Sequence, residues 1–140
     1  MKKKICIIES KYNEDITKQI SSIAYNELKK SGINKIDIVK VPGAFEIPVT
    51  ISRLIKKYDG FIAVGCIIKG ETANFDLICQ AITNGIMQLS INEKKTIGNA
   101  ILTCFNKDQA FERLDKGKEA VTAVLKVLNA KSLATNAQSK

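Results

Sequence analysis

The sequence predicts an α/β protein: a three-layer α/β/α sandwich around a four-stranded parallel sheet. Short β-branched apolar segments alternate with longer segments whose apolar residues recur every three or four positions, which is typical of β-α-β units. The chain has 140 residues, 45% of them hydrophobic, which suits one domain with a core of its own. We therefore expect a single domain over residues 1–130 and a polar tail over residues 131–140.

In the first half, residues 4–9 form a β-branched apolar run, which predicts a buried strand. A helix is expected over residues 13–30, with Asn13 as its N-cap and acids in its first turn. Residues 36–41 predict a second strand. Apolar residues at helical spacing over 48–58 predict a second helix, with a proline in its first turn.

In the second half, residues 61–68 form a continuous apolar run, the most buried strand expected. A long helix over residues 74–90 and a fourth strand over 97–103 follow. The last helix is expected from Asp108 to Leu128. The segment Asp115–Lys118 should kink or interrupt it.

The formal charge is +8, from 22 basic and 14 acidic residues, and only Arg53 and Arg113 are arginines. Nucleic-acid readers favour the bidentate fork of Arg, and the lysines are spread along the chain, so we expect a solvated surface and no nucleic-acid partner. The run 61–68 is far shorter than the about 20 residues of a membrane span, and no signal peptide is visible. The sequence therefore predicts no membrane partner and a cytoplasmic location.

Histidine is absent, which excludes Cys–His and Ser–His catalysis. The four cysteines contain no CxxC pair, so neither a zinc site nor a disulfide framework is expected. We expect no metal and no other cofactor.

In a parallel α/β sheet, ligands bind beyond the carboxyl ends of the strands. This rule selects four segments without any further knowledge of the protein. They are residues 10–13, 42–46, 66–74 and 104–106.

The segment after the second strand, Pro42–Pro48, combines a glycine turn with a helix start. A carboxylate at Glu46 could accept hydrogen bonds from ligand hydroxyls or ring N–H groups. The more frequent alternative is a helix entry with Phe45 in the core and Glu46 favouring the helix dipole.

The segment Gly65–Asp76 runs from a buried strand through a glycine loop to a helix N-terminus, a geometry that binds anions. Its glycine spacing resembles a P-loop, but Glu71 stands where a P-loop needs lysine. On these residues alone, Thr72 and Asn74 are equally compatible with phosphate binding and with helix capping.

Two further side chains are candidates. Tyr12, just past the first strand, could stack on a planar heterocycle, although a core or surface tyrosine is the commoner case. Arg113, on the polar side of the last helix, could hold a phosphate, although a surface arginine beside Glu112 is the commoner case.

Taken in order, these segments resemble the lumazine synthase family over residues 4–128. The resemblance implies a flavodoxin-like fold and a transferase of riboflavin biosynthesis. In that reaction 5-amino-6-(D-ribitylamino)uracil condenses with 3,4-dihydroxy-2-butanone 4-phosphate to 6,7-dimethyl-8-ribityllumazine. The matching motifs are Lys11-Tyr12-Asn13, Val41-Pro42-Gly43-Ala44-Phe45-Glu46-Ile47-Pro48 and Gly65-Cys66-Ile67-Ile68-Lys69-Gly70-Glu71-Thr72, with weaker matches at 101–103 and 109–113.

The resemblance also implies roles for individual residues. Tyr12 stacks on the pyrimidine, residues 44–46 line the ribityl and ring pocket, and residues 66–68 offer backbone groups to the ring edge. The implied substrate-binding residues are Tyr12, Ala44, Phe45, Glu46, Cys66, Ile67, Ile68 and Asn99. The implied phosphate-binding residues are Glu71, Thr72 and Arg113.

Asn99 is expected at the start of the fourth strand, away from the other site residues, so only a neighbouring subunit could deliver it to them. The family forms pentameric rings with sites between subunits; the rings stand alone, pair or build icosahedral shells. We therefore expect a homo-oligomer, a pentamer or a multiple of it, that takes small-molecule substrates. The resemblance adds riboflavin synthase as a further partner, and leaves open whether Lys116 reaches the site.

One position departs from the family, whose proton-transfer histidine is replaced by Asn74. An amide does not titrate near pH 7, and losing general acid–base help lowers a rate by roughly 10²–10⁴-fold. We expect a slower enzyme in which Glu71, a bound water or the substrate's phosphate moves protons. The catalytic positions are thus Asn74 and Glu71.

Three other functions fit parts of the sequence. A ring-forming homologue could bind lumazine or flavin without turnover. A basic protein could bind RNA or another polyanion through its lysines, with a steep salt dependence. A flavodoxin-like protein could bind a whole flavin nucleotide without subunit contacts.

Overall fold

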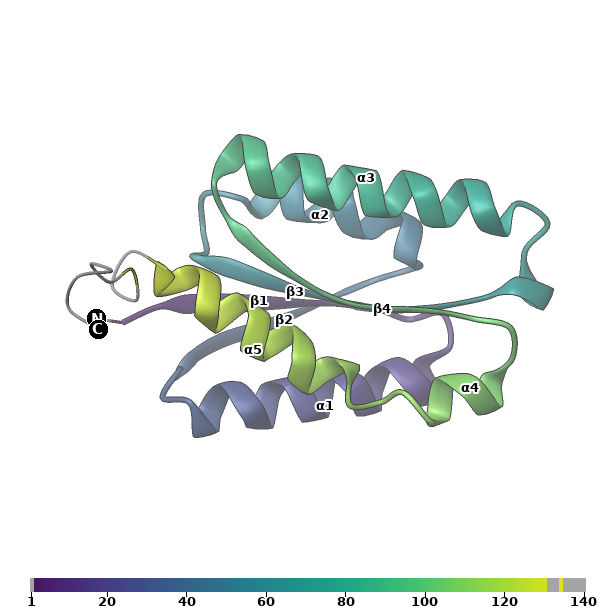
Figure 1. Cartoon of the computed structure of the whole chain (residues 1–140), viewed down its shortest axis with the longest axis horizontal. Helices are drawn as coiled ribbons and strands as arrows, with labels where there is room; N and C mark the ends of the chain where they lie inside the picture. Colours follow the sequence, from purple (N-terminus) through teal and green to yellow (C-terminus); the bar gives the residue numbers. More distant parts are fainter. Residues whose placement is uncertain (1, 131–133, 135–140) are drawn as a thin grey trace.

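A parallel sheet with strand order β2-β1-β3-β4 forms the middle layer of the computed structural model, and helices cover both faces (Figure 1). The structure describes residues 2–130 and 134. The expected three-layer, flavodoxin-like α/β/α sandwich is confirmed. The expected polar tail lies outside the described residues, apart from residue 134. No helix within 2–130 is long and apolar enough to cross a membrane.

The elements follow the expected alternation. The strands are β1 (Lys4–Ser10), β2 (Lys35–Val41), β3 (Gly60–Ile68) and β4 (Thr96–Cys104). The helices are α1 (Glu14–Lys30), α2 (Ile47–Leu54), α3 (Phe75–Glu93), α4 (Lys107–Phe111) and α5 (Lys116–Leu128), with short 3₁₀ turns η1 (Ala44–Glu46) and η2 (Lys69–Glu71).

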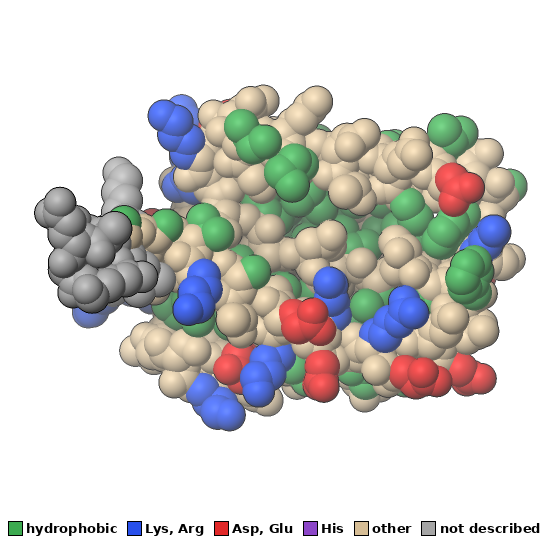
Figure 2. All heavy atoms as spheres, in the orientation of Figure 1, with side chains coloured by type: hydrophobic (Ala, Val, Ile, Leu, Met, Phe, Trp, Pro, Cys, Tyr) green, Lys and Arg blue, Asp and Glu red, His purple; other side chains and the backbone are tan. Residues whose placement is uncertain are grey.

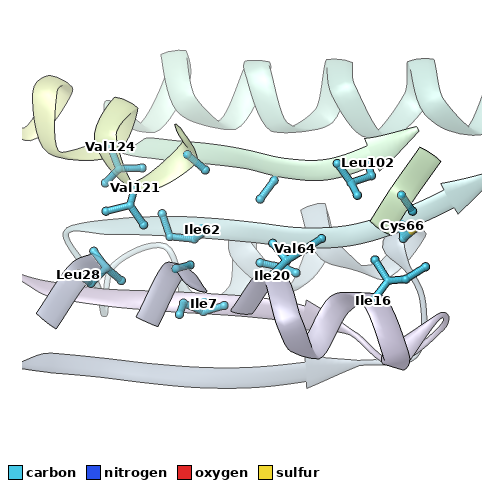
Figure 3. Close-up of a cluster of buried hydrophobic side chains, with 14 of the residues drawn as sticks. Ile7, Ile16, Ile20, Leu28, Ile62, Val64, Cys66, Leu102, Val121 and Val124 are labelled. Carbon is cyan, nitrogen blue, oxygen red and sulfur yellow. The ribbon is translucent and has the colours of Figure 1, made fainter. Parts of the chain in front are cut away.

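Alternate residues of each strand enter two separate apolar cores, because successive side chains point to opposite faces of a sheet. One core lies between the sheet and the pair α1 and α5, where Ile7, Ile20, Ile62 and Val121 point toward one another (Figure 3). The other core lies between the sheet and the pair α2 and α3. Both faces of the sheet are therefore covered, as all-parallel sheets require.

The central strand β3 is buried along its whole length. Its ladder with β1 ends where Glu9 pairs with Val64, whereas its ladder with β4 continues to Ile68 and Cys104. The last residues of β3 therefore have no strand on their β1 side. This difference in ladder length leaves a backbone edge open at the carboxyl end of the sheet.

The last helical region differs from the expectation. The interruption lies at residues 112–115, which share only Asp115 with the expected segment Asp115–Lys118, and α5 then begins at Lys116. Gly117 lets α5 pack closely on α1, because a Cβ on it would lie 2.6 Å from the Ile20 carbonyl oxygen. Arg113 consequently lies in a turn between two helices and not on a helix face.

The second helix is also shorter than expected, because α2 ends at Leu54. Tyr58 is still buried: its hydroxyl donates a hydrogen bond to Asp37 Oδ2 at 2.6 Å, and its ring meets Phe61 edge-on at 5.6 Å. Tyr58 thus contacts β2 from beyond the end of α2.

The surface seen in Figure 2 has an apolar part and a charged part. Apolar side chains gather over α3 and along the trough between α3 and the sheet, whereas most charged side chains in this view lie over α4 and α5. The large exposed apolar residues on α3 are Leu77, Met87 and Ile91.

Candidate functional site

A pocket of about 310 Å³ opens at the carboxyl ends of β1, β2 and β3, where parallel sheets place their ligands. It brings together eight of the residues singled out in the sequence. They are Tyr12, Ala44, Phe45, Cys66, Ile67, Ile68, Glu71 and Thr72, and Gly43 and Ile78 complete the lining.

Two aromatic side chains stand at this pocket with much of their surface exposed. Tyr12 is 55% exposed and Phe45 is 63% exposed. The backbone of Tyr12 is held in place, since its N–H donates to the carbonyl of Pro42 at 3.1 Å. The alternative that placed Phe45 in the core is therefore wrong, because the core position of this segment is taken by Ala44. Exposed aromatic rings beside an apolar pocket suit a planar ligand.

Ala44 fits closely against β3 because residue 65 is glycine. A Cβ on Gly65 would lie 3.2 Å from the Cβ of Ala44. This contact seats η1 directly on the strand that carries Cys66 and Ile67. The pocket floor is thus set by the absence of a side chain at position 65.

Glu46 is turned toward its own backbone. Its Oε1 accepts a hydrogen bond from the N–H of Gly43 at 2.9 Å, which closes the turn before α2. Glu46 does not line the pocket, so the helix-entry interpretation describes its state in the isolated chain. Contact with a ligand would use its second carboxylate oxygen.

Residues 66–68 form the open backbone edge of β3. All three are buried, and burial raises the pKa of the Cys66 thiol to about 12. A thiol with so high a pKa stays protonated near neutral pH, so it is not a nucleophile. What this segment can offer a ligand is backbone hydrogen-bonding groups.

The segment between β3 and α3 lines the pocket through Glu71 and Thr72. Asn74 precedes α3 but makes no side-chain cap hydrogen bond, so the capping interpretation does not hold for its side chain. Asn74 is exposed and flanks the pocket residues Glu71 and Thr72. The first N–H groups of a helix have no partners inside the helix, so the start of α3 offers hydrogen-bond donors that suit an anion.

Asn13 is the site residue whose role sequence reasoning missed. It does precede α1 as expected, but its side chain makes no cap. Its Nδ2 instead donates to the Cys66 carbonyl and to Glu71 Oε1, both at 3.1 Å. Only the tolerance of asparagine for a positive φ, 61° here, could have hinted at this in the sequence.

Asn99 and Arg113 lie in a different pocket, of about 570 Å³, beside β4 at the edge of the sheet. Asn99 lies within β4 opposite Ala63, further into the strand than expected, and its Oδ1 accepts from the Ile101 N–H at 3.0 Å. Lys116 lines this same pocket. One chain therefore does not bring these three side chains to Tyr12.

Within the described part of the chain, no three His, Cys, Asp or Glu side chains are grouped so that they could hold a metal ion. The aromatic rings, backbone groups and helix start around the pocket suit a planar ring, a polar chain and an anion.

Comparison with known proteins gives a consistent result. Residues 2–132 match the family model described as 6,7-dimethyl-8-ribityllumazine synthase. A protein of that name from Leuconostoc mesenteroides is 39% identical over 136 residues, covering 91% of this chain and 87% of its own. One from Limosilactobacillus reuteri is 42% identical over 124 residues, covering 85% and 82%. One from Corynebacterium kroppenstedtii is 33% identical over 129 residues, covering 87% and 80%.

Proposed function

Because this chain belongs to the 6,7-dimethyl-8-ribityllumazine synthase family, we propose that it condenses 5-amino-6-(D-ribitylamino)uracil with 3,4-dihydroxy-2-butanone 4-phosphate. Membership makes it a transferase of riboflavin biosynthesis. The observation that carries the proposal is the meeting of eight expected substrate positions in one pocket.

The pyrimidine would stack on the ring of Tyr12 and place its polar edge along the open backbone of residues 66–68. The β1 ladder stops at Val64, so this edge is open apart from the Cys66 carbonyl, which accepts a hydrogen bond from Asn13. Phe45 would cover the ribityl chain, whose hydroxyls would donate to Glu46.

The phosphate of the second substrate would lie at the start of α3. Backbone N–H groups near Glu71 and Thr72, with the Thr72 hydroxyl, would hold it, and the dipole of this 19-residue helix favours an anion there.

A second copy of the chain would complete the site. Arg113, Lys116 and Asn99 line one pocket that is separate from the Tyr12 pocket, so a neighbour that presents this group would supply the missing cations. We propose a homopentamer or a multiple of it, with each site shared between two subunits.

The chemistry needs few protein groups. The substrate amine attacks the ketone carbon and water leaves to form an imine; phosphate is then eliminated, and the second amine closes the ring with loss of water. Holding both substrates in place contributes up to about 7–11 kcal/mol in favourable reactions. Asn74 can donate and accept hydrogen bonds but cannot carry the proton, so the carboxylate of Glu71, a bound water or the leaving phosphate would move it.

The test is the rate of lumazine formation, followed by absorbance, for the wild type and an Asn74→His variant. We expect slow but clear wild-type turnover that rises in the variant. No turnover above the uncatalysed condensation, with activity restored by histidine, would replace the proposal with a ring-forming protein that binds lumazine or flavin. No turnover in either would remove the synthase function altogether.

A further inference from the structure

Asn13 has an unusual backbone conformation. Its φ of 61° and ψ of 46° place it in the left-handed region, which asparagine enters more readily than other side-chain-bearing residues. Such conformations persist when surrounding contacts enforce them, and they concentrate at functional sites. The capping hydrogen bond that would ordinarily justify asparagine before a helix is not made.

The Asn13 side chain makes two hydrogen bonds in place of the cap. A carbonyl oxygen (Cys66) and a carboxylate oxygen (Glu71) both lie 3.1 Å from Nδ2. Both partners are acceptors, so only the amide NH₂ can face them, and its two N–H groups suffice for both bonds. The orientation of the amide is therefore set by its partners.

These two bonds join two stretches that are far apart in the chain. The carbonyl bond ties the turn before α1 to the open edge of β3, and the carboxylate bond ties the same turn to η2, which directly follows β3. The Glu71 carboxylate is exposed, and within residues 2–130 its one hydrogen bond is the one from Asn13. Glu71 lines the pocket together with Thr72.

We propose that Asn13 is a positioning residue that aims the Glu71 carboxylate into the pocket. This rests on the proposed function, in which Glu71 is a candidate to move the proton in place of the absent histidine. Asn13 acts through Glu71 and through the backbone of Cys66. A glutamate on a surface turn would otherwise sample many rotamers, and a proton carrier must lie within hydrogen-bond reach of its target.

A second contact of η2, besides the Asn13–Glu71 hydrogen bond, supplies a matched control. Lys69 Nζ lies 5.4 Å from the ring centroid of Phe105, which links η2 to the turn after β4. Lys69→Ala removes this link and leaves the Asn13–Glu71 bond in place. If activity depended only on holding residues 69–71 in place, Lys69→Ala and an Asn13 variant would have the same effect.

The test uses the full-length protein with Asn13→Gly, Asn13→Asp and Lys69→Ala. Glycine accepts the positive φ without strain and removes both bonds, and aspartate keeps the shape but turns a carboxylate toward Glu71. We expect Asn13→Gly to lower kcat/KM roughly 10- to 100-fold. In Asn13→Asp the acidic limb of the pH–rate profile should move to higher pH, because two close carboxylates resist joint ionisation. Lys69→Ala should keep the wild-type profile.

Hydrogen exchange of residues 69–74 tests, without reference to activity, whether the Asn13 hydrogen bonds hold this segment in place. Faster exchange in Asn13→Gly at an unchanged melting temperature shows that Asn13 holds this segment in place. If no variant makes lumazine, this result still stands and only the proposed function fails. Wild-type exchange in Asn13→Gly overturns the proposal. So does a pH–rate profile that Asn13→Asp leaves unmoved or that Lys69→Ala moves equally.

Discussion

Tyr12 and Arg113 line two different pockets of the same chain. Tyr12 stands at the carboxyl ends of β1–β3, and Arg113 stands in the turn between α4 and α5 beside the edge strand β4. Their separation gives the proposed shared site a direct test.

Mixed oligomers of Tyr12→Ala and Arg113→Ala should show a higher kcat/KM than either variant alone. If one copy supplies the Tyr12 pocket and its neighbour supplies Arg113, random equal mixing leaves about one quarter of the sites with both halves intact. The measurement is lumazine formation by co-expressed variants, with each variant expressed alone as control. Mixtures no more active than the better single variant would contradict a shared site.

Tyr12→Ala should raise KM for the pyrimidine substrate roughly tenfold, since a stacked ring contributes about 0.5–1.5 kcal/mol beyond its buried area. Melting temperature should stay unchanged, because Tyr12 is 55% exposed. Tyr25→Ala, which removes a surface ring from α1, is the control and should leave KM as it is. Equal effects of the two substitutions would show that Tyr12 does not touch the ring.

Gly117→Ala should destabilise the protein by about 1–3 kcal/mol, the usual range for overpacking. The new Cβ would lie 2.6 Å from the Ile20 carbonyl oxygen. Helix propensity alone predicts the opposite sign, a gain of roughly 0.5–1 kcal/mol for alanine, so urea unfolding separates the two effects. Gly70→Ala, where nothing lies within 4 Å of the added Cβ, is the control. It should stay within about 0.5 kcal/mol of wild type.

Stability should fall as pH rises from about 9 to about 12. Burial raises the pKa of Cys6 and of Cys66 from 9.0 to about 12 in the folded protein. Over this window the unfolded thiols release protons that the folded ones keep, so alkali favours unfolding by up to about 1.4 kcal/mol per thiol and pH unit. Unfolding free energies at several pH values should show this slope. A Cys6→Ala/Cys66→Ala variant should show a smaller one, and an equal slope would assign the effect to other groups.

Much of the architecture could be predicted because its signals are local. The apolar run at 61–68 predicts a buried central strand, and β3 (Gly60–Ile68) is that strand. The carboxyl-end rule for parallel sheets led to the segments after the first three strands, and the structure places their residues around one pocket. The expected boundaries were less accurate near Leu54 and residues 112–115, where Tyr58 and Gly117 make contacts with segments remote in sequence that no local pattern shows.

The sequence by itself determined the order of elements, the layers and the segments that meet at the sheet edge, since side-chain periodicity reflects which face each element buries. Only the tertiary structure decided how far the β1–β3 ladder runs, where Glu46 turns, and that Asn13 reaches Glu71 across 58 residues of chain. It also decided that Arg113 lies apart from Tyr12, whereas the separation of Asn99 was expected from its place in the fourth strand. These facts depend on distances between segments remote in sequence, and no local pattern encodes such distances.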